Sequence, residues 1–131
     1  GRNYMHGPAY GAGKAAVDNM AHDMAVDFRS HSVAVVSIWM GLLLTERTRM
    51  VLEAEPEMYA DLADTAETPQ YTGRVIDALY RDPLLMDRSG KVWIGAELGA
   101  EYGVTDIIGR QPPSHRALFG ETTTFGDAMV E

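Results

Sequence analysis

The sequence of 131 residues contains no cysteine, which excludes disulfide bonds, thiolate zinc sites, iron–sulfur clusters and cysteine nucleophiles together. Basic residues are also scarce: 11 Lys and Arg stand against 19 Asp and Glu, and the formal net charge is -8. Phosphate backbones and anionic lipid surfaces would repel a chain of this sign. We therefore expect no nucleic-acid partner and no membrane partner.

Long apolar runs are missing too. No segment approaches the roughly 20 apolar residues that a membrane helix needs, and residues 1–10 lack the charged-then-apolar order of a signal peptide. Together with the absence of cysteine, this predicts a cytoplasmic protein. Apolar residues make up 46% of the chain and charged residues 23%, a composition typical of one folded domain.

An amphipathic helix is predicted over residues 10–29, because small and apolar side chains recur there every four positions. This stripe consists of Ala12, Ala16, Met20, Met24 and Phe28, with Ala15, Ala21 and Ala25 beside it. Small alanines allow another helix or a sheet to approach closely. We interpret Asp18, Asp23 and Asp27 as the solvated face, since no metal-ligand spacing accompanies them.

Two strands are predicted after this helix. Residues 33–39 form a β-branched run with almost no polar alternation, which is typical of a strand buried on both faces, and residues 91–96 form a second apolar strand. An amphipathic helix followed by such a strand is the second half of a βαβ unit and favours a parallel sheet. Residues 42–69 are predicted to form two short amphipathic helices broken at Pro56, and a further helix ends near Asp82. The glycines and prolines after residue 98 predict a tail with little regular structure.

Two strands are too few for a stable sheet, because natural sheets usually hold about four to six. A parallel pair with two apolar faces would leave its edges unpaired and its faces uncovered. We therefore interpret residues 1–131 as the C-terminal part of a single larger α/β domain.

Residues 11–16 formally match the G-x-G-x-x-A dinucleotide fingerprint, but no apolar strand precedes them, and the fingerprint requires one. The phosphate-binding loop G-x-x-x-x-G-K-[ST] also fails. Pro8 stands where its first glycine should be, and Ala15 stands where its hydroxyl residue should be. Neither pattern predicts a phosphate site here.

Tyr10 and Lys14 are more informative, because a four-residue spacing places both side chains on one helix face. A tyrosine hydroxyl has an unperturbed pKa of about 10, so it is a poor base at neutral pH until a nearby cation favours the phenolate. Lys14 can supply that cation. Such a pair suits proton exchange with an alcohol or carbonyl oxygen. On spacing alone, an exposed structural pair is an equally good interpretation.

Residues 8–17, the helix after them and residues 33–46 together resemble the C-terminal half of a short-chain dehydrogenase/reductase. The resemblance covers nearly the whole chain and implies a Rossmann-type, doubly wound parallel sheet, present here as its C-terminal portion. It also implies NAD or NADP as cofactor and an alcohol or carbonyl as substrate. Tyr10 and Lys14 match the catalytic Y-x-x-x-K motif of that family, in which both side chains also contact the cofactor.

The resemblance assigns three further residues to the cofactor. Gly41, Leu43 and Thr45 match the turn that holds the nicotinamide carboxamide, and Met40 stands where the family usually has proline. Residues 42–69 match the segment that closes over substrate. The tail, consisting of residues 89–103 with Asp106 and residues 109–110, is similar to one branch of the family.

The family also requires a glycine-rich turn, an asparagine and a serine, all of which would precede residue 1. We therefore expect the isolated 131-residue chain to be inactive. The whole protein is expected to be a homo-oligomer that pairs through the alanine-rich helix face. The alternative is a non-catalytic interaction module with the same fold. No metal is predicted, and surface or capping roles are expected for all four histidines, His6, His22, His31 and His115.

Overall fold

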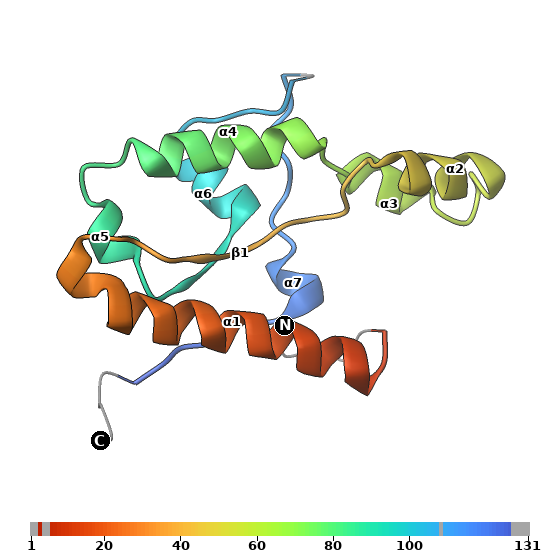
Figure 1. Ribbon diagram of the computed structural model, residues 1–131. Helices are drawn as coiled ribbons and strands as arrows, with labels where there is room; N and C mark the ends of the chain where they lie inside the picture. Colours follow the sequence, from red (N-terminus) through yellow and green to blue (C-terminus); the bar gives the residue numbers. More distant parts are fainter. Residues whose placement is uncertain (1–2, 4–5, 108, 127–131) are drawn as a thin grey trace. The chain divides into compact units, whose positions relative to one another are not determined.

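The structure is a computed structural model that describes residue 3 and residues 6–107 and 109–126 (Figure 1). The chain divides into two compact units. The first unit comprises residues 1–38, 83–93 and 116–131, and the second comprises residues 39–82 and 94–115. Both units are therefore assembled from segments that lie far apart in the sequence.

The first unit is built around one long helix and most of a small sheet. Helix α1 spans Pro8–Phe28 and confirms the predicted helix; its first turn contains Pro8, a position at which proline loses no helical hydrogen bond. The strands β1 (Ser37–Trp39) and β2 (Val92–Ile94) are hydrogen-bonded neighbours in a two-stranded sheet. The shorter elements of this unit are η1 (Arg29–His31), α5 (Leu85–Arg88) and α7 (Arg116–Phe119).

Small side chains on α1 form the buried side of this helix. Ala21 and Ala25 are buried, and a Cβ atom added at Gly90 would lie 3.4 Å from the Cβ of Ala25. The loop backbone therefore approaches the helix closely, as the alanine-rich face predicted. Because Ala21 and Ala25 already pack inside the unit, they are not open to a second copy. The stripe through Met20, Met24 and Phe28 is exposed instead.

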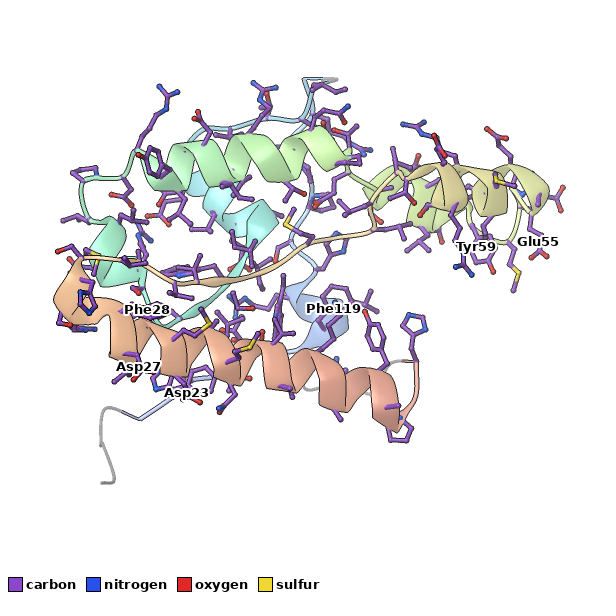
Figure 2. All side chains as sticks on the ribbon, in the orientation of Figure 1. Asp23, Asp27, Phe28, Glu55, Tyr59 and Phe119 are labelled. Atoms are coloured by element: carbon purple, nitrogen blue, oxygen red, sulfur yellow. The ribbon has the colours of Figure 1, made fainter. Side chains whose placement is uncertain are left out.

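Asp18 corrects our interpretation of the acidic helix face. Its side chain is buried, and the Ser37 hydroxyl donates a hydrogen bond of 2.6 Å to its Oδ1 atom. A buried carboxylate needs such a partner, and Ser37 on β1 supplies it. Asp23 and Asp27 are exposed as predicted and project from the helix surface (Figure 2).

The predicted strand over residues 33–39 is shorter and less buried than expected. Only Ser37–Trp39 are strand residues, and the Val33 side chain is 46% exposed. The Ser89 hydroxyl accepts a hydrogen bond from the Val35 N–H at 2.9 Å, and the Gly90 N–H donates to the Val35 carbonyl at 2.8 Å. Part of this apolar run is thus held by a turn instead of a second strand.

The second unit is helical. It contains α2 (Glu46–Ala54), α3 (Ala60–Thr65), α4 (Pro69–Tyr80) and α6 (Gly95–Glu101). Helices α4 and α6 pack on each other (Figure 1). Tyr71 on α4 and Leu98 on α6 are both almost fully buried. A Cβ atom at Gly99 would lie 1.8 Å from the Tyr71 hydroxyl, so only glycine allows this close packing.

The tail is more regular than the sequence predicted. Residues 95–96, expected at the end of a strand, begin α6, and residues 116–119 form α7. Three glycines of the second unit were interpreted as signs of irregular structure, but they allow close packing or form turns. Gly99 lies inside α6, whereas Gly103 and Gly109 adopt positive φ angles of 66° and 76° in the following turns.

Candidate active site

The Tyr10–Lys14 pair lies at the start of α1. The helix begins after Gly7, whose φ of 88° favours glycine, and Tyr10 lies in the first helical turn. The Lys14 ammonium is 5.6 Å from the centroid of the Tyr10 ring, and the His6 ring contacts the same ring edge-on at 5.1 Å. The structure therefore brings Tyr10 and Lys14 together as predicted.

This pair is open to a ligand. The Tyr10 side chain is 44% exposed, and its hydroxyl has no hydrogen-bond partner among the residues that the structure describes. Lys14 is exposed as well and has no ion pair within those residues. A free hydroxyl beside a positive charge is an arrangement that can exchange a proton with a bound oxygen atom.

The second group of predicted residues forms one turn in the second unit. Gly41 and Leu43 are half-buried, and Thr45 is exposed at the N-cap of α2. The Thr45 hydroxyl accepts a hydrogen bond from the Thr48 N–H at 3.3 Å, as expected of an N-cap residue. Thr45 therefore links the turn over residues 41–44 to the start of α2.

Leu43 forms an isolated parallel bridge with Glu67. In this bridge the Leu44 N–H donates to the Glu67 carbonyl at 2.8 Å, and the Glu67 N–H donates to the Leu42 carbonyl at 2.9 Å. Because peptide groups alternate in direction along an extended chain, the N–H of Leu43 points away from Glu67. This N–H has no hydrogen-bond partner among the described residues, so it can donate a hydrogen bond to an oxygen atom of a ligand.

Glu67 also reaches this turn through its side chain, a contact that sequence reasoning missed. The carboxyl group is fully buried, and its Oε1 atom accepts the Gly41 N–H at 3.1 Å. Burial raises the pKa of Glu67 above its ordinary value, the Gly41 hydrogen bond opposes this shift, and the charge of Asp106 adds to it. No sequence motif marks Glu67 as part of the site, because Gly41 lies 26 residues away.

The segment around Glu67 is itself fixed from the tail. The buried Asp106 carboxylate accepts the Thr68 N–H at 2.8 Å and the Thr68 hydroxyl at 2.5 Å. Burial alone would raise the pKa of Asp106, but these bonds, the Ile107 N–H and the Arg110 charge outweigh it and lower the pKa. The Arg110 guanidinium also donates to the carbonyls of Asp64 and Ala66.

Surface or capping roles were expected for all four histidines, and a surface role is wrong for His115. Its ring is buried, and a Cβ atom added at Gly41 would lie 2.1 Å from its Nε2 atom. Burial lowers the pKa of His115, because the charged imidazolium is disfavoured away from water. The glycine at position 41 therefore makes room for this ring, which no local sequence pattern could have indicated.

A hollow of about 610 Å³ adjoins the turn in the second unit. Its wall includes Leu44, Thr45, Arg47, Arg49, Pro69 and Gln70. All six residues lie in or beside the predicted lid, which the structure resolves into α2, α3 and the start of α4. Whether this segment closes over a substrate stays a prediction.

A metal site and a membrane-spanning helix can be searched for in the part of the chain that the structure describes. Within residues 6–107 and 109–126, no three His, Asp or Glu side chains are grouped so that they could hold a metal ion. None of the described helices is both long and apolar enough to cross a membrane.

Comparison with known proteins gives two kinds of match. The short chain dehydrogenase family matches residues 1–56, which include Tyr10, Lys14, Gly41, Leu43 and Thr45. The relatives include Dehydrogenase/reductase SDR family member 1 of Mus musculus, 40% identical over 126 residues, and its namesake in Homo sapiens, 34% identical over 122 residues. These alignments cover 90% and 88% of this chain.

The chain spans only 40% and 39% of the lengths of these two relatives. The family to which it is similar has a Rossmann-like fold, and the small sheet with its helices agrees with that fold. The branch of the family to which the tail was predicted to be similar is the one that contains these two relatives. The matches therefore confirm the predicted similarity of this chain to the short-chain dehydrogenase/reductase family, and to member 1 in particular.

Proposed function

We propose that this chain is the C-terminal part of an NAD(P)-dependent oxidoreductase that interconverts an alcohol and a carbonyl. The observation that carries the proposal is the Tyr10 hydroxyl, which is exposed at the start of α1 with the Lys14 ammonium beside its ring. The similarity to the short-chain dehydrogenases supports it, because the Y-x-x-x-K spacing falls within the matched residues.

In this proposal Tyr10 is the acid or base. During alcohol oxidation the substrate hydroxyl gives its proton to the Tyr10 oxygen, and in the reverse direction Tyr10 returns a proton to the carbonyl oxygen. The nicotinamide, when bound, accepts or supplies the hydride. Lys14 stabilises the negative charge that develops on the phenol oxygen and would bond the nicotinamide ribose.

Gly41, Leu43 and Thr45 would hold the carboxamide end of the cofactor. The fit is supported by the Leu43 N–H, which points away from Glu67 and is unused among the described residues. A carboxamide oxygen is a hydrogen-bond acceptor and suits such a donor. The glycine-rich turn and the catalytic serine would come from sequence that precedes residue 1. A homo-oligomer remains part of the proposal, with Ala21 and Ala25 excluded as its contact.

The test is the change of Tyr10 to phenylalanine in the complete protein that carries this segment. The ring stays and the exchangeable proton is lost, so hydride transfer followed by NAD(P)H absorbance should fall by about 10²–10⁴-fold. Tyr80→Phe is a matched control, because Tyr80 is a tyrosine 77% exposed at the end of α4. Activity of Tyr10→Phe within about tenfold of the wild type would argue against the assignment and favour the non-catalytic module.

A further inference from the structure

Glu67 holds the turn around Leu43 at three points. Its side chain accepts the Gly41 N–H at 3.1 Å, its own N–H donates to the Leu42 carbonyl at 2.9 Å, and its carbonyl accepts the Leu44 N–H at 2.8 Å. The residues on both sides of Leu43 are therefore hydrogen-bonded to Glu67.

The consequence concerns the direction of the Leu43 peptide group. Two backbone bonds fix residues 42 and 44, and rotation about the preceding residues is limited by the Gly41 bond. The Leu43 N–H must then point to the opposite edge, where no described residue accepts it. A donor fixed in advance binds its acceptor with less loss of conformational entropy.

The position of Glu67 is also fixed. The neighbouring residue Thr68 is bound by the buried Asp106 through two hydrogen bonds, and the Thr68 hydroxyl caps α4 by accepting the Tyr71 N–H at 3.3 Å. Arg110 donates to the carbonyl of Ala66 on the other side. Glu67 is therefore held by its neighbours before any ligand arrives.

We propose that Glu67 is a positioning residue for the nicotinamide carboxamide, which it serves by clamping residues 41–44 so that the Leu43 N–H faces the cofactor. This inference rests on the proposed function and assigns a role to a residue outside the Tyr10–Lys14 pair and outside the matched residues 1–56. Burial of the carboxyl group makes the Gly41 bond stronger than the same bond in water would be.

The first measurement uses the complete protein without ligand. Amide hydrogen exchange should be slower at Gly41, whose N–H is bonded to Glu67, than at Leu43, whose N–H is unused. In Glu67→Leu the Gly41 amide should exchange about tenfold faster, as expected for a lost bond of about 1.4 kcal/mol. In Glu67→Gln, which keeps an acceptor oxygen, it should exchange as in the wild type. Equal exchange at Gly41 and Leu43 in the wild type would overturn the clamp without any variant.

The second measurement compares two ligands. The dissociation constant of NAD(H) or NADP(H) should rise about tenfold in Glu67→Leu, and that of ADP-ribose, which lacks nicotinamide, should not change. Glu67→Gln should bind both ligands as the wild type does. Because the two ligands share the adenosine and pyrophosphate groups, ADP-ribose binding also shows whether the variant is folded.

The outcomes separate the two proposals. If the wild type binds the dinucleotide and Glu67→Leu binds it equally well, only the role of Glu67 is wrong. If the wild type binds neither ligand, the proposed function and the role of Glu67 are both wrong. If Glu67→Leu does not fold, the amide exchange rates of Gly41 and Leu43 in the wild type test the role of Glu67: slower exchange at Gly41 supports it, and equal exchange overturns it.

Discussion

The start of α1 and the turn over residues 41–45 carry the two halves of the predicted site, and they are held in different ways. Tyr10 and Lys14 are placed by one helix turn and by Gly7 immediately before it. The turn is held by hydrogen bonds to Glu67, which is remote in sequence, and the His115 ring packs closely against Gly41. A local arrangement can be inferred from spacing, whereas a turn held by remote contacts cannot.

The contrast also predicts how each region responds to mutation. Changes at the exposed start of α1 should alter chemistry with little effect on folding, because Tyr10 and Lys14 make few contacts that a substitution would remove. Changes that remove a contact around the turn should lower the stability of the fold as well as weaken dinucleotide binding, because Gly41, Glu67 and Asp106 belong to one buried network.

The largest effect on stability is expected for Asp106→Asn. Removing the negative charge weakens the bonds from Thr68 and Ile107, and bonds to charged groups contribute about 1.5–3 kcal/mol. Denaturant unfolding of the complete protein measures this loss. The control is Asp77→Asn, which removes an exposed pair with Arg81, and such pairs contribute only about 0.3–0.5 kcal/mol.

The pH dependence of Asp106 sharpens this prediction. Its pKa is lowered in the folded protein, so it stabilises the fold above pH 3.8, and this contribution is lost as the pH falls below that value. The difference in unfolding free energy between the wild type and Asp106→Asn should therefore become smaller as the pH falls into the acid range. A difference that stays constant from neutral pH to acid would show that the charge is not the stabilising feature.

Gly41→Ala is expected to have the next largest effect. The new Cβ would lie 2.1 Å from His115 Nε2 and 3.1 Å from Glu67 Oε2, and overpacking of this kind costs about 1–3 kcal/mol. The matched change is Gly11→Ala in α1, where a Cβ meets nothing within 4 Å; it should raise stability by about 0.5–1 kcal/mol. Thermal unfolding of both variants would measure the difference, and equal effects would contradict the tight packing at Gly41.

The smallest predicted effect is the pH response of His115. Its pKa is lowered by burial, so as the pH falls below 6.5 the unfolded chain binds a proton that the folded protein resists. Stability should fall across the window from 6.5 down to the pKa of the folded state. His115→Gln should flatten this part of the stability profile, whereas the exposed His31→Gln should leave it as in the wild type. An unchanged slope in His115→Gln would assign the effect to another group.

Several parts of the fold could be predicted because their causes are local. The periodicity of small and apolar residues predicted α1, and the break at Pro56 separated the helices now seen as α2 and α3. The predicted Tyr10–Lys14 pair follows from the same helix geometry. The strands were placed correctly in the sequence but predicted too long, since their ends depend on what packs beside them.

The sequence by itself determined that residues 10–29 are helical and which residues resemble an oxidoreductase site, because helix periodicity and motif spacing are properties of neighbouring residues. Tertiary structure alone decided that Asp18 and His115 are buried and that Glu67 holds the turn at Gly41. Burial and hydrogen bonding depend on which distant segments meet. A carboxylate or imidazole looks the same in sequence whether water or a buried partner will surround it.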